Sequence, residues 1–369
     1  FDGIGGCRQA LKELNIDCEY YASEIDPYAI KVAKANHPDI IEIGDAKGLA
    51  VEDGYIFHNQ NNDPMKNGGS FKVDIDLLVA GFPCQSFSIA GNQKGFEDER
   101  GQLFFDLLRI LDDVKPKYFL FENVFSMGKA NKDIIDEKLG IKHICINSSL
   151  LTAQQRKRIY WIGRLVGDKY EQVMVEQPED VGIFLKDIID DEADEKLFIK
   201  EIILATFTKK GAIKGLRSLD EKSLCLTASL HKGFGNDSCT VIRSPVRIGH
   251  FNKGGQADRV YSIEGKSVCL QGEAGGKGAK TGLYEIDGGI RKLSVNECEK
   301  LQGFPTDYCS SVSPTQGYKC LGNSFTVPVI KHILQTLKKP THLTFQNAEV
   351  EKSYWLSSIA KELQDKAKT

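Results

Sequence analysis

The stretch IDLLVAGFPCQ, residues 75–85, decides the expected fold, because a buried strand in it gives way abruptly to a reactive turn. Residues 75–80 form an almost continuous apolar run, which is typical of a strand in a parallel sheet that is covered on both faces. Gly81 and Pro83 break the strand, and Cys84 follows at once. A thiol at the carboxyl end of a buried strand is a candidate nucleophile, although most single cysteines are inert buried thiols.

Strand-like and helix-like segments alternate around this stretch, from residue 1 to about residue 165. We expect strands at residues 19–22, 40–43, 75–80, 118–121, 143–147 and 159–162, and helices at residues 7–14, 27–36 and 101–114. This alternation predicts an α/β fold with a doubly wound, mostly parallel, Rossmann-like sheet. Ligands of such sheets bind at the carboxyl ends of the strands. The candidates at that edge are the glycine-rich turn of residues 1–6, Glu24, Asp45, Cys84 and Glu122.

The regular alternation stops after about residue 166, where glycines become frequent. Short β-like pieces are expected at residues 240–242, 259–262 and 267–270, and helices at residues 294–301, 325–337 and 351–366. Ser294 and Glu297 have the spacing of a capping box. We therefore expect a catalytic domain from residues 1–165 and 293–340, a smaller, loop-rich recognition domain from residues 166–292, and a tail from residues 341–369. Residues 59–70 are expected to form a polar surface loop.

Charge is unevenly distributed along the chain, although the total is close to neutral. The net charge is −3, yet residues 200–292 contain 16 lysine and arginine residues against 9 acidic ones. Residues 176–195 contain 9 acidic residues and a single lysine. A basic segment can bind a polyanion without a basic total, so residues 200–292 are a candidate nucleic-acid contact. Two ordinary solvated faces are the alternative.

Length and cysteine usage place the chain among large intracellular proteins. With 369 residues and 41% hydrophobic composition, it can form two domains with a substantial core. The ten cysteines show no CxxC pair and no Cys/His ligand spacing, so we predict no metal site and a reducing compartment. No apolar run could span a bilayer, and no signal peptide is present. Phe1 has the character of the last residue of a buried strand, so we expect that earlier residues are missing from this sequence.

Three charged residues at strand ends complete a candidate site with Cys84. Glu122 ends the apolar run of residues 118–121, where burial raises the pKa of a carboxyl group toward the range that a general acid needs. Arg156 and Arg158 alternate along an expected strand and therefore point to one face. Their guanidinium groups can hold a carbonyl oxygen, a phosphate or Glu122 itself. A helix cap or a structural ion pair is the alternative role for each residue alone.

The opening turn, FDGIGG at residues 1–6, suits a nucleotide-like cofactor that lies close to the backbone. It lacks the dinucleotide fingerprint GxGxxG, and the chain contains no P-loop motif. Glu24 follows the strand expected at residues 19–22, where acidic residues of dinucleotide folds accept hydrogen bonds from ribose hydroxyls.

Six ordered motifs resemble those of the cytosine-5 DNA methyltransferases, in the form found in bacteria and phages. They are FxGxGG at residues 1–6, GFPCQ at 81–85, ENV at 122–124, QxRxR at 154–158, RKLxxxExxxLQGFP at 291–305 and GNS at 322–324. The resemblance covers about residues 1–165 and 247–337. We do not find the [DNS]-P-P-[YFW] site of adenine and N4-cytosine methyltransferases, and residues 167–244 match no part of the pattern.

The resemblance implies S-adenosyl-L-methionine as the cofactor and S-adenosyl-L-homocysteine as its product. Glu24 is expected to hold the ribose hydroxyls, and Ile25 to pack against the adenine. The residues that the resemblance assigns to the cofactor pocket are Phe1, Gly3, Ile4, Gly6, Glu24, Ile25, Asp45, Ala46, Pro83, Leu103, Asn323 and Ser324. Because the last two are remote in sequence, the C-terminal helix is expected to pack against the first domain.

The resemblance also implies a sequence-specific DNA cytosine-5 methyltransferase. Cys84 would add to C6 of a flipped-out cytosine while Glu122 donates a proton to N3. Arg158 would hold O2, and Arg156 would support Glu122 and the neighbouring loop. The residues expected to contact DNA are Gln85, Ser88, Gln256 and Arg259. Residue 269 is a cysteine where the resemblance predicts a hydroxyl residue.

Two other functions are weighed against this one: a tRNA cytosine-5 methyltransferase on the same fold, and a catalytically silent DNA-binding relative. The net-positive recognition segment favours duplex DNA over tRNA. The presence of Cys84, Glu122 and Arg158 argues against a silent relative. We expect a monomer in the cytoplasm of a bacterial or phage-infected cell, with double-stranded DNA and a cognate restriction endonuclease as partners and without membrane contact.

Overall fold

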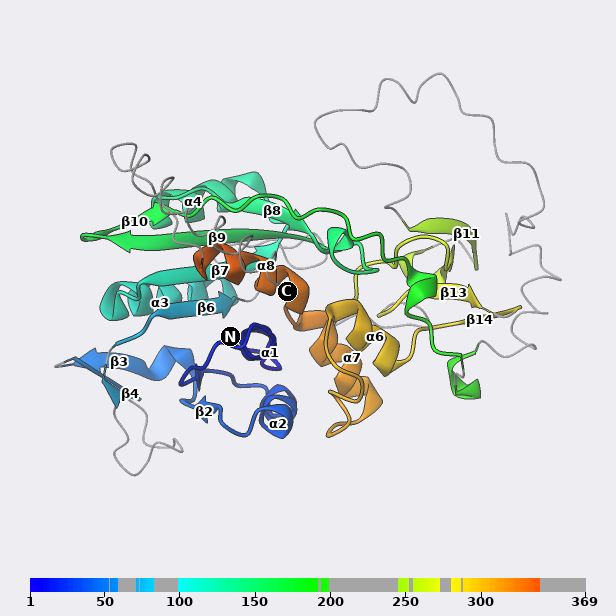
Figure 1. Ribbon diagram of the computed structural model, residues 1–369, viewed down its shortest axis with the longest axis horizontal. Helices are drawn as coiled ribbons and strands as arrows, with labels where there is room; N and C mark the ends of the chain where they lie inside the picture. Colours follow the sequence, from blue (N-terminus) through cyan, green and yellow to red (C-terminus); the bar gives the residue numbers. More distant parts are fainter. Residues whose placement is uncertain are drawn as a thin grey trace, which may run out of the picture.

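The computed structural model describes residues 1–52, 54–58, 71–72, 74–82, 99–191, 194–198, 245–251, 255–272, 280–286 and 288–338 (Figure 1). Several expectations lie outside the described residues: the surface loop at 59–70, the β-like piece at 240–242 and the tail. The same is true of four expected site residues, Pro83, Cys84, Gln85 and Ser88. Among the described residues, no helix has the length and apolar character needed to cross a membrane.

A five-stranded sheet forms the centre of the fold, in the order β10-β9-β7-β6 with β8 also paired to β9. Its strands are β6 (Leu77–Gly81), β7 (Tyr118–Val124), β8 (Ile144–Asn147), β9 (Lys157–Val166) and β10 (Lys169–Gln172). β6 and β7 are parallel, whereas β9 runs antiparallel to β7, β8 and β10. The predicted α/β fold is confirmed, but the sheet is mixed: among its described strands only β6 and β7 pair in parallel, and β9 pairs antiparallel with β7 and, toward the edge, with β8 and β10. That edge is antiparallel because a tight turn joins β9 to β10 and no crossover helix separates β8 from β9.

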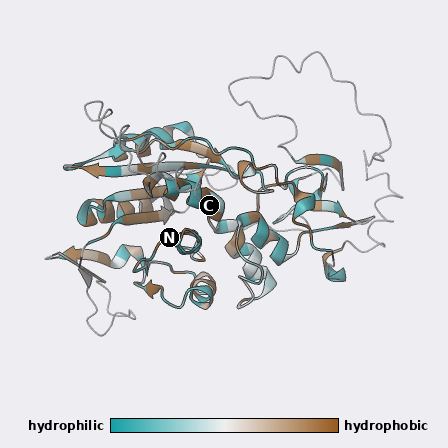
Figure 2. Ribbon diagram, viewed as in Figure 1, coloured by the Kyte–Doolittle hydropathy of each residue, from teal (hydrophilic) through white to brown (hydrophobic). Residues whose placement is uncertain are grey.

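Helices cover both faces of this sheet, as expected for a doubly wound fold (Figure 1). They are α1 (Gly6–Glu13), α3 (Glu99–Val114), α4 (Lys129–Leu139) and α8 (Val327–Lys338), whereas α2 (Pro27–Asn36) lies farther from this sheet. Side chains alternate along β7, so Leu120 joins one core cluster with residues of α1 and α8, while Phe119 and Phe121 join the other with residues of α3 and α4. In Figure 2, β6 is brown along most of its length, in keeping with its apolar sequence.

Two smaller sheets flank the amino-terminal helices. β1 (Tyr21–Ala22) and β2 (Ile41–Glu42) form a parallel pair, shorter than the expected strands. β3 (Leu49–Glu52), β4 (Tyr55–His58) and β5 (Phe71–Lys72) form an antiparallel sheet that the sequence pattern did not predict. The amino group of Phe1 donates to the carbonyl of Ser23, and the amide of Gly81 donates to the carbonyl of Phe1 at 3.4 Å. Phe1 therefore connects the end of β1 to the end of β6.

A four-stranded sheet contains the described strands that follow residue 198. Its order is β11 (Val246–His250), β12 (Arg259–Ser262), β13 (Leu283–Ile286) and β14 (Gly289–Arg291). β12 has the predicted bounds. The strand predicted at 267–270 is wrong, because Ser267 makes only a single bridge, to Gln154. Its backbone pairs with the segment before β9: the Ser267 amide donates to the Ala153 carbonyl at 2.7 Å, and the Gln155 amide donates to the Ser267 carbonyl at 2.9 Å.

Two further helices follow, α6 (Val295–Gln302) and α7 (Pro314–Asn323). The predicted capping box of α6 is confirmed, since the Glu297 amide donates to Ser294 Oγ at 3.0 Å and the Ser294 amide donates to Glu297 Oε2 at 2.7 Å. α7 was not predicted, because Gly317 and Gly322 interrupt its helical pattern. Single turns of 3-10 helix complete the fold: η1 (Ala46–Gly48), η3 (Ser148–Leu150), η4 (Leu185–Asp187), η5 (Glu195–Leu197) and η8 (Gln256–Asp258).

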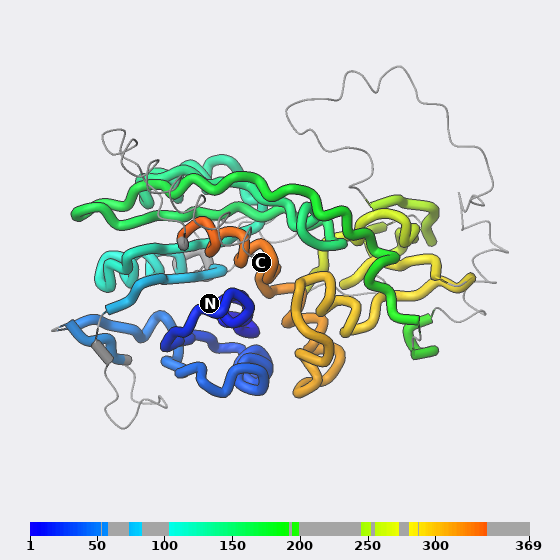
Figure 3. The backbone as a smooth tube through the Cα atoms, in the orientation of Figure 1, coloured from blue at the N-terminus to red at the C-terminus, as the bar shows by residue number. Residues whose placement is uncertain are grey.

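The carboxyl-terminal helices return to the amino-terminal part of the chain, as the smooth trace in Figure 3 shows for α8 and α1. The Tyr308 hydroxyl donates to the Ile4 carbonyl at 2.8 Å. Lys319 on α7 forms an ion pair with Asp26 at 3.1 Å, which joins α7 to the start of α2. The expected return of the C-terminal helix is confirmed.

Candidate active site

Glu122 and Arg158 meet at the carboxyl end of β7. The register pairs Gly81 with Glu122 and Val124 with Arg158, so the end of β6, the end of β7 and the start of β9 lie together. Nε of Arg158 is 2.8 Å from Oε1 of Glu122, and the two side chains are 13% and 14% exposed. Burial raises the pKa of the Glu122 carboxyl, and the charges of Arg158 and Arg156 limit that rise. The pair can therefore present a carboxyl proton and a guanidinium to the same ligand.

Arg156 is a buried brace between distant parts of the chain. Its side chain is only 2% exposed. Nη2 donates to the carbonyls of Gly322 and Ser324 at 3.0 and 2.9 Å, and Nη1 donates to the carbonyl of Leu270 at 3.3 Å. Within the described residues its guanidinium makes no hydrogen bond to Glu122. Its contacts indicate that it positions residues 270 and 322–324 against the start of β9.

Cys269, where the resemblance predicted a hydroxyl residue, lies between the two arginines. Its Sγ is 3.5 Å from Nη1 of Arg156 and 4.0 Å from Nη2 of Arg158. Burial opposes ionisation of this thiol, but the two guanidinium charges more than offset that effect, so the pKa of Cys269 is lowered. A row of polar contacts, Glu122–Arg158–Cys269–Arg156, thus runs from β7 into the segment after β12.

Phe82 and Asn123 anchor the chain that leads to Cys84. The Phe82 ring is buried against Phe104 and Trp161, with centroids 5.4 and 6.1 Å away. Nδ2 of Asn123 donates to the Phe82 carbonyl at 3.2 Å. Asn123 entered the sequence analysis only as the middle letter of ENV, and its role is visible only once β6 and β7 are paired. Cys84 itself lies outside the described residues.

Gly3, Glu24 and Ile25 form the part of the expected cofactor pocket that is open to a ligand. The Gly3 amide donates to Oε2 of Glu24 at 2.8 Å. Gly3 has a positive φ of 67°, and a Cβ built there would meet nothing within 4 Å. The Ile25 side chain is 70% exposed. A backbone turn in open space, a carboxylate and an exposed apolar side chain fit the ribose and ring of a nucleoside.

Other expected cofactor residues are engaged in packing. Ile4 is 1% exposed. A Cβ on Gly6 would lie 3.2 Å from Cβ of Phe325, so this glycine permits close packing. Asp45 caps η1 by accepting from the Lys47 amide at 3.0 Å. These residues shape the backbone beneath the pocket.

The remaining expected cofactor residues lie on three elements. Ala46, in η1, is buried, and Leu103, in α3, is partly exposed. Asn323 ends α7 and is exposed, whereas Ser324 is 5% exposed and donates from Oγ to the Leu321 carbonyl at 3.0 Å. Phe1, partly exposed, lies between β1 and β6.

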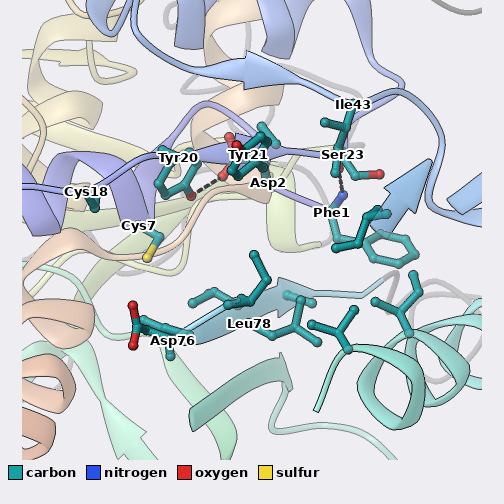
Figure 4. A pocket seen from close by; sticks show the side chains of 18 of the residues that line it. Phe1, Asp2, Cys7, Cys18, Tyr20, Tyr21, Ser23, Ile43, Asp76 and Leu78 are labelled. Atoms are coloured by element: carbon teal, nitrogen blue, oxygen red, sulfur yellow. Dashed lines mark hydrogen bonds between the residues drawn. The ribbon is translucent and has the colours of Figure 1, made fainter. Parts of the chain in front are cut away.

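A cavity of about 650 Å³ lies between β1 and β6 (Figure 4). Residues 74–80, which include most of β6, line one side, and residues 18–23 line the other. Of the expected cofactor residues, only Phe1 and Ala46 line it. The cavity therefore extends along the strands, whereas Gly3, Glu24 and Ile25 lie at their carboxyl ends.

Of the expected DNA-contact residues, Gln256 and Arg259 lie in and beside the four-stranded sheet. Gln256 begins η8 and is exposed, and Arg259 begins β12 and is partly exposed. Gln154 connects this half to the site, although the sequence analysis assigned it no role. It is fully buried, accepts from the Leu270 amide at 3.1 Å and donates to the Leu301 carbonyl at 3.4 Å. Its only sequence signal was its place as the first letter of QxRxR.

The family model and similar curated proteins point to the same family. The family model described as C-5 cytosine-specific DNA methylase matches residues 1–339. The Type II methyltransferase M.HhaI of Haemophilus parahaemolyticus is 31% identical over 343 residues, covering 90% of this chain and 91% of that protein. The Type II methyltransferase M.NlaX of Neisseria lactamica is 31% identical over 349 residues, covering 92% of this chain and 94% of that protein.

Solved structures agree on the fold. The methyltransferase EhMeth of Entamoeba histolytica superposes with a TM-score of 0.59 at 16% identity, covering 91% of this chain and 95% of that one. The S. pombe Dnmt2 methyltransferase gives a TM-score of 0.57 at 18% identity, covering 93% and 98%. At these identities the likeness concerns the fold alone.

Proposed function

Because the chain belongs to the C-5 cytosine-specific DNA methylases, we propose that it transfers a methyl group from S-adenosyl-L-methionine to C5 of cytosine in double-stranded DNA, with sequence specificity. One observation supports this chemistry above the others: the buried Glu122–Arg158 pair lies beside the end of β6, from which the chain continues to Cys84. Cys84 follows Phe82 by two residues, and two residues span at most about 7 Å.

The reaction is limited by the low nucleophilicity of C5. When the Cys84 thiolate forms a bond to C6, the C5–C6 double bond opens and the ring becomes an enamine whose nucleophilic carbon is C5. Protonation of N3 by Glu122 takes up the displaced electron pair and so favours this addition. Arg158 holds O2 and keeps Glu122 oriented. After C5 has accepted the methyl group, loss of its proton restores the double bond and expels Cys84. The target base must leave the helix stack to reach these residues, at a cost of a few kcal/mol.

For the cofactor, we propose that Gly3, Glu24 and Ile25 hold the nucleoside part. The glycine turn would approach it closely, Glu24 would accept from the ribose hydroxyls, and Ile25 would cover the adenine. S-adenosyl-L-methionine supplies an electrophilic methyl group on a sulfonium. Phe1, Asp45, Ala46, Pro83, Leu103, Asn323 and Ser324 would complete the pocket, with Ile4 and Gly6 supporting the turn.

For the DNA, we propose contacts from Gln85, Ser88, Gln256 and Arg259. Arg259 would reach a guanine edge or a phosphate, and a base-edge contact of this kind contributes about 1–3 kcal/mol. Residues 166–292 would form the recognition domain, and residues 1–165 with 293–340 the catalytic domain. The relatives are named Type II methyltransferases, which supports a role in restriction and modification beside a cognate endonuclease. We propose that the protein acts as a monomer in the cytoplasm.

Trapping on duplex DNA that contains 5-fluorocytosine tests the proposal. Fluorine cannot leave C5 as a proton does, so the adduct between Cys84 and C6 persists in denaturing gels. We expect a cofactor-dependent adduct with the intact protein and no adduct with Cys84→Ala. Cys145→Ala, which removes one thiol in β8, is the matched control and should still form the adduct. An undiminished adduct in Cys84→Ala would contradict the mechanism. Methyl transfer to tRNA but not to duplex DNA would contradict the substrate.

A further inference from the structure

An exposed aromatic ring with two lysines over it lies beside the Glu122–Arg158 pair. Phe125, directly after β7, is 45% exposed. Nζ of Lys132 is 4.6 Å and Nζ of Lys157 is 5.5 Å from the centre of its ring, both within the range of cation–π attraction. Nζ of Lys132 also donates to the Phe125 carbonyl at 2.8 Å. Phe125, Lys132 and Lys157 are called the Phe125 surface below.

The sheet register places the Phe125 surface at the site. Val124 pairs with Arg158, so Phe125 leaves β7 next to the first residues of β9. Side chains alternate along β9, and Lys157 therefore faces away from the side on which Arg156 and Arg158 contact Cys269. At the start of β9, Arg156 and Arg158 therefore lie on one face of the sheet and Lys157 lies on the other.

Within the described residues, the neighbouring helix α4 places no carboxylate against Lys132. In α4, Lys129 and Asp133 form an ion pair at 2.7 Å, and Asp136 is buried with His143 and Trp161. Within the described residues, Lys132 has no carboxylate partner. The first turn of α4 contains no acidic residue. A ring flanked by cations beside a nucleic-acid site is the composition expected of a contact with a phosphate backbone.

We propose that Lys132 and Lys157, held in place by Phe125, bind the phosphate backbone of the DNA strand next to the target cytosine. This inference rests on the proposed function. The proposed contact lies on the face of β9 opposite Arg158. It adds to the DNA contacts expected from Gln256 and Arg259, near the four-stranded sheet. The two lysines neutralise phosphates and carry no sequence information, so they contribute affinity on any duplex.

The salt dependence of binding tests the inference, because it counts neutralised phosphates. Log affinity falls with log salt by about 0.9 for each phosphate that a cation neutralises. For Lys132→Gln with Lys157→Gln we expect the slope to fall by about 2, and the affinity near 0.1 M salt to fall about 10- to 100-fold. The measurement is fluorescence anisotropy on a duplex that the intact protein methylates, between about 50 and 200 mM salt.

A matched pair of lysines at the opposite end of the sheet provides the control. Lys115 precedes β7, and Lys169 begins β10, where it pairs with Val166 at the far end of β9. Lys115→Gln with Lys169→Gln removes the same charge and should leave the slope unchanged. An equal fall in both double variants, or no fall in either, overturns the inference. Absence of methylation by the intact protein would instead contradict the proposed function, so the two failures are distinguishable.

Discussion

Glu122 is subject to two opposing influences, and their balance sets the protonation state that the reaction needs. Burial favours the neutral carboxyl, whereas Arg158 at 2.8 Å favours the carboxylate. The net effect is a raised pKa, so a larger fraction of Glu122 is protonated near neutral pH than in an ordinary glutamate. The same two guanidinium groups, Arg156 and Arg158, lower the pKa of Cys269.

Replacement of Glu122 by glutamine tests the acid role. The amide retains the shape of the side chain but has no carboxyl proton to give, so we expect methylation to slow by about 10²- to 10⁴-fold. DNA affinity should change only a few-fold. Single-turnover methylation and equilibrium binding measure the two effects separately, and equal losses in both would contradict the assignment. In the intact protein, the rate should fall as pH rises through the raised pKa of Glu122 and the carboxyl loses its proton.

At the scale of elements, the contact between the end of α7 and the segment after β12 depends on glycine. A Cβ on Gly322 would lie 2.3 Å from the amide nitrogen of Gly272, and one on Gly272 would lie 2.1 Å from Oδ1 of Asn323. Arg156 binds the carbonyls of both segments and holds them at this distance. The end of α7, which includes Asn323 and Ser324, is therefore positioned by the segment after β12.

Gly322→Ala should disrupt this contact. The added methyl group overlaps backbone atoms, which cannot rotate away as a side chain can, so we expect a loss of about 1–3 kcal/mol in the free energy of unfolding. Gly128→Ala is the matched control, because a Cβ there meets nothing within 4 Å; it should cost less than about 1 kcal/mol. Urea denaturation of both variants provides the comparison. Equal stabilities of the two variants would show that the segments separate freely.

Element prediction from sequence succeeded where local signals were strong. The bounds of α2 were predicted, because Asp26 caps it and Pro27 begins it. α4 was missed, since charged residues occur around most of it, and α7 was missed because of its glycines. The pairing of Ser267 with the segment before β9 was not predictable, since a partner more than a hundred residues away decided it.

At the scale of the whole molecule, two buried carboxyl groups link stability to pH. Burial raises the pKa of Asp2 to about 6, although a hydrogen bond from Tyr20 opposes the rise and Glu24 adds to it. Burial, together with the charge of Asp2, raises the pKa of Glu42 to about 7. Oδ2 of Asp2 and Oε2 of Glu42 are buried without a hydrogen-bond partner among the described residues, as suits protonated groups.

The sign of the pH effect follows from these shifts. The folded protein keeps the two protons to higher pH than the unfolded chain does, so their contribution is full below about pH 4 and is lost as pH rises to about 7. His37 acts in the opposite direction, because burial lowers its pKa to about 4. A comparison with Asp2→Asn separates these effects.

We expect Asp2→Asn to gain stability relative to the intact protein as pH rises from 4 to 8. A shift of about two pKa units corresponds to at most about 3 kcal/mol. Urea denaturation at several pH values measures the difference, and Asp17→Asn, at a surface position, serves as the control. A difference that does not change with pH would show that Asp2 ionises in the fold as it does in the unfolded chain.

The sequence by itself determined the α/β class, the order of the site motifs and the choice of Glu122 and Arg158 as candidate site residues, which the structure brings together. It could do so because strand ends, turns and motif spacing are local properties of the chain. Only the tertiary structure decided that Arg156 acts as a brace, that Cys269 lies between two arginines, and that Phe125 carries two lysines beside the site. These contacts join segments that are distant in sequence, and their distances depend on sheet register and packing, which no local pattern specifies.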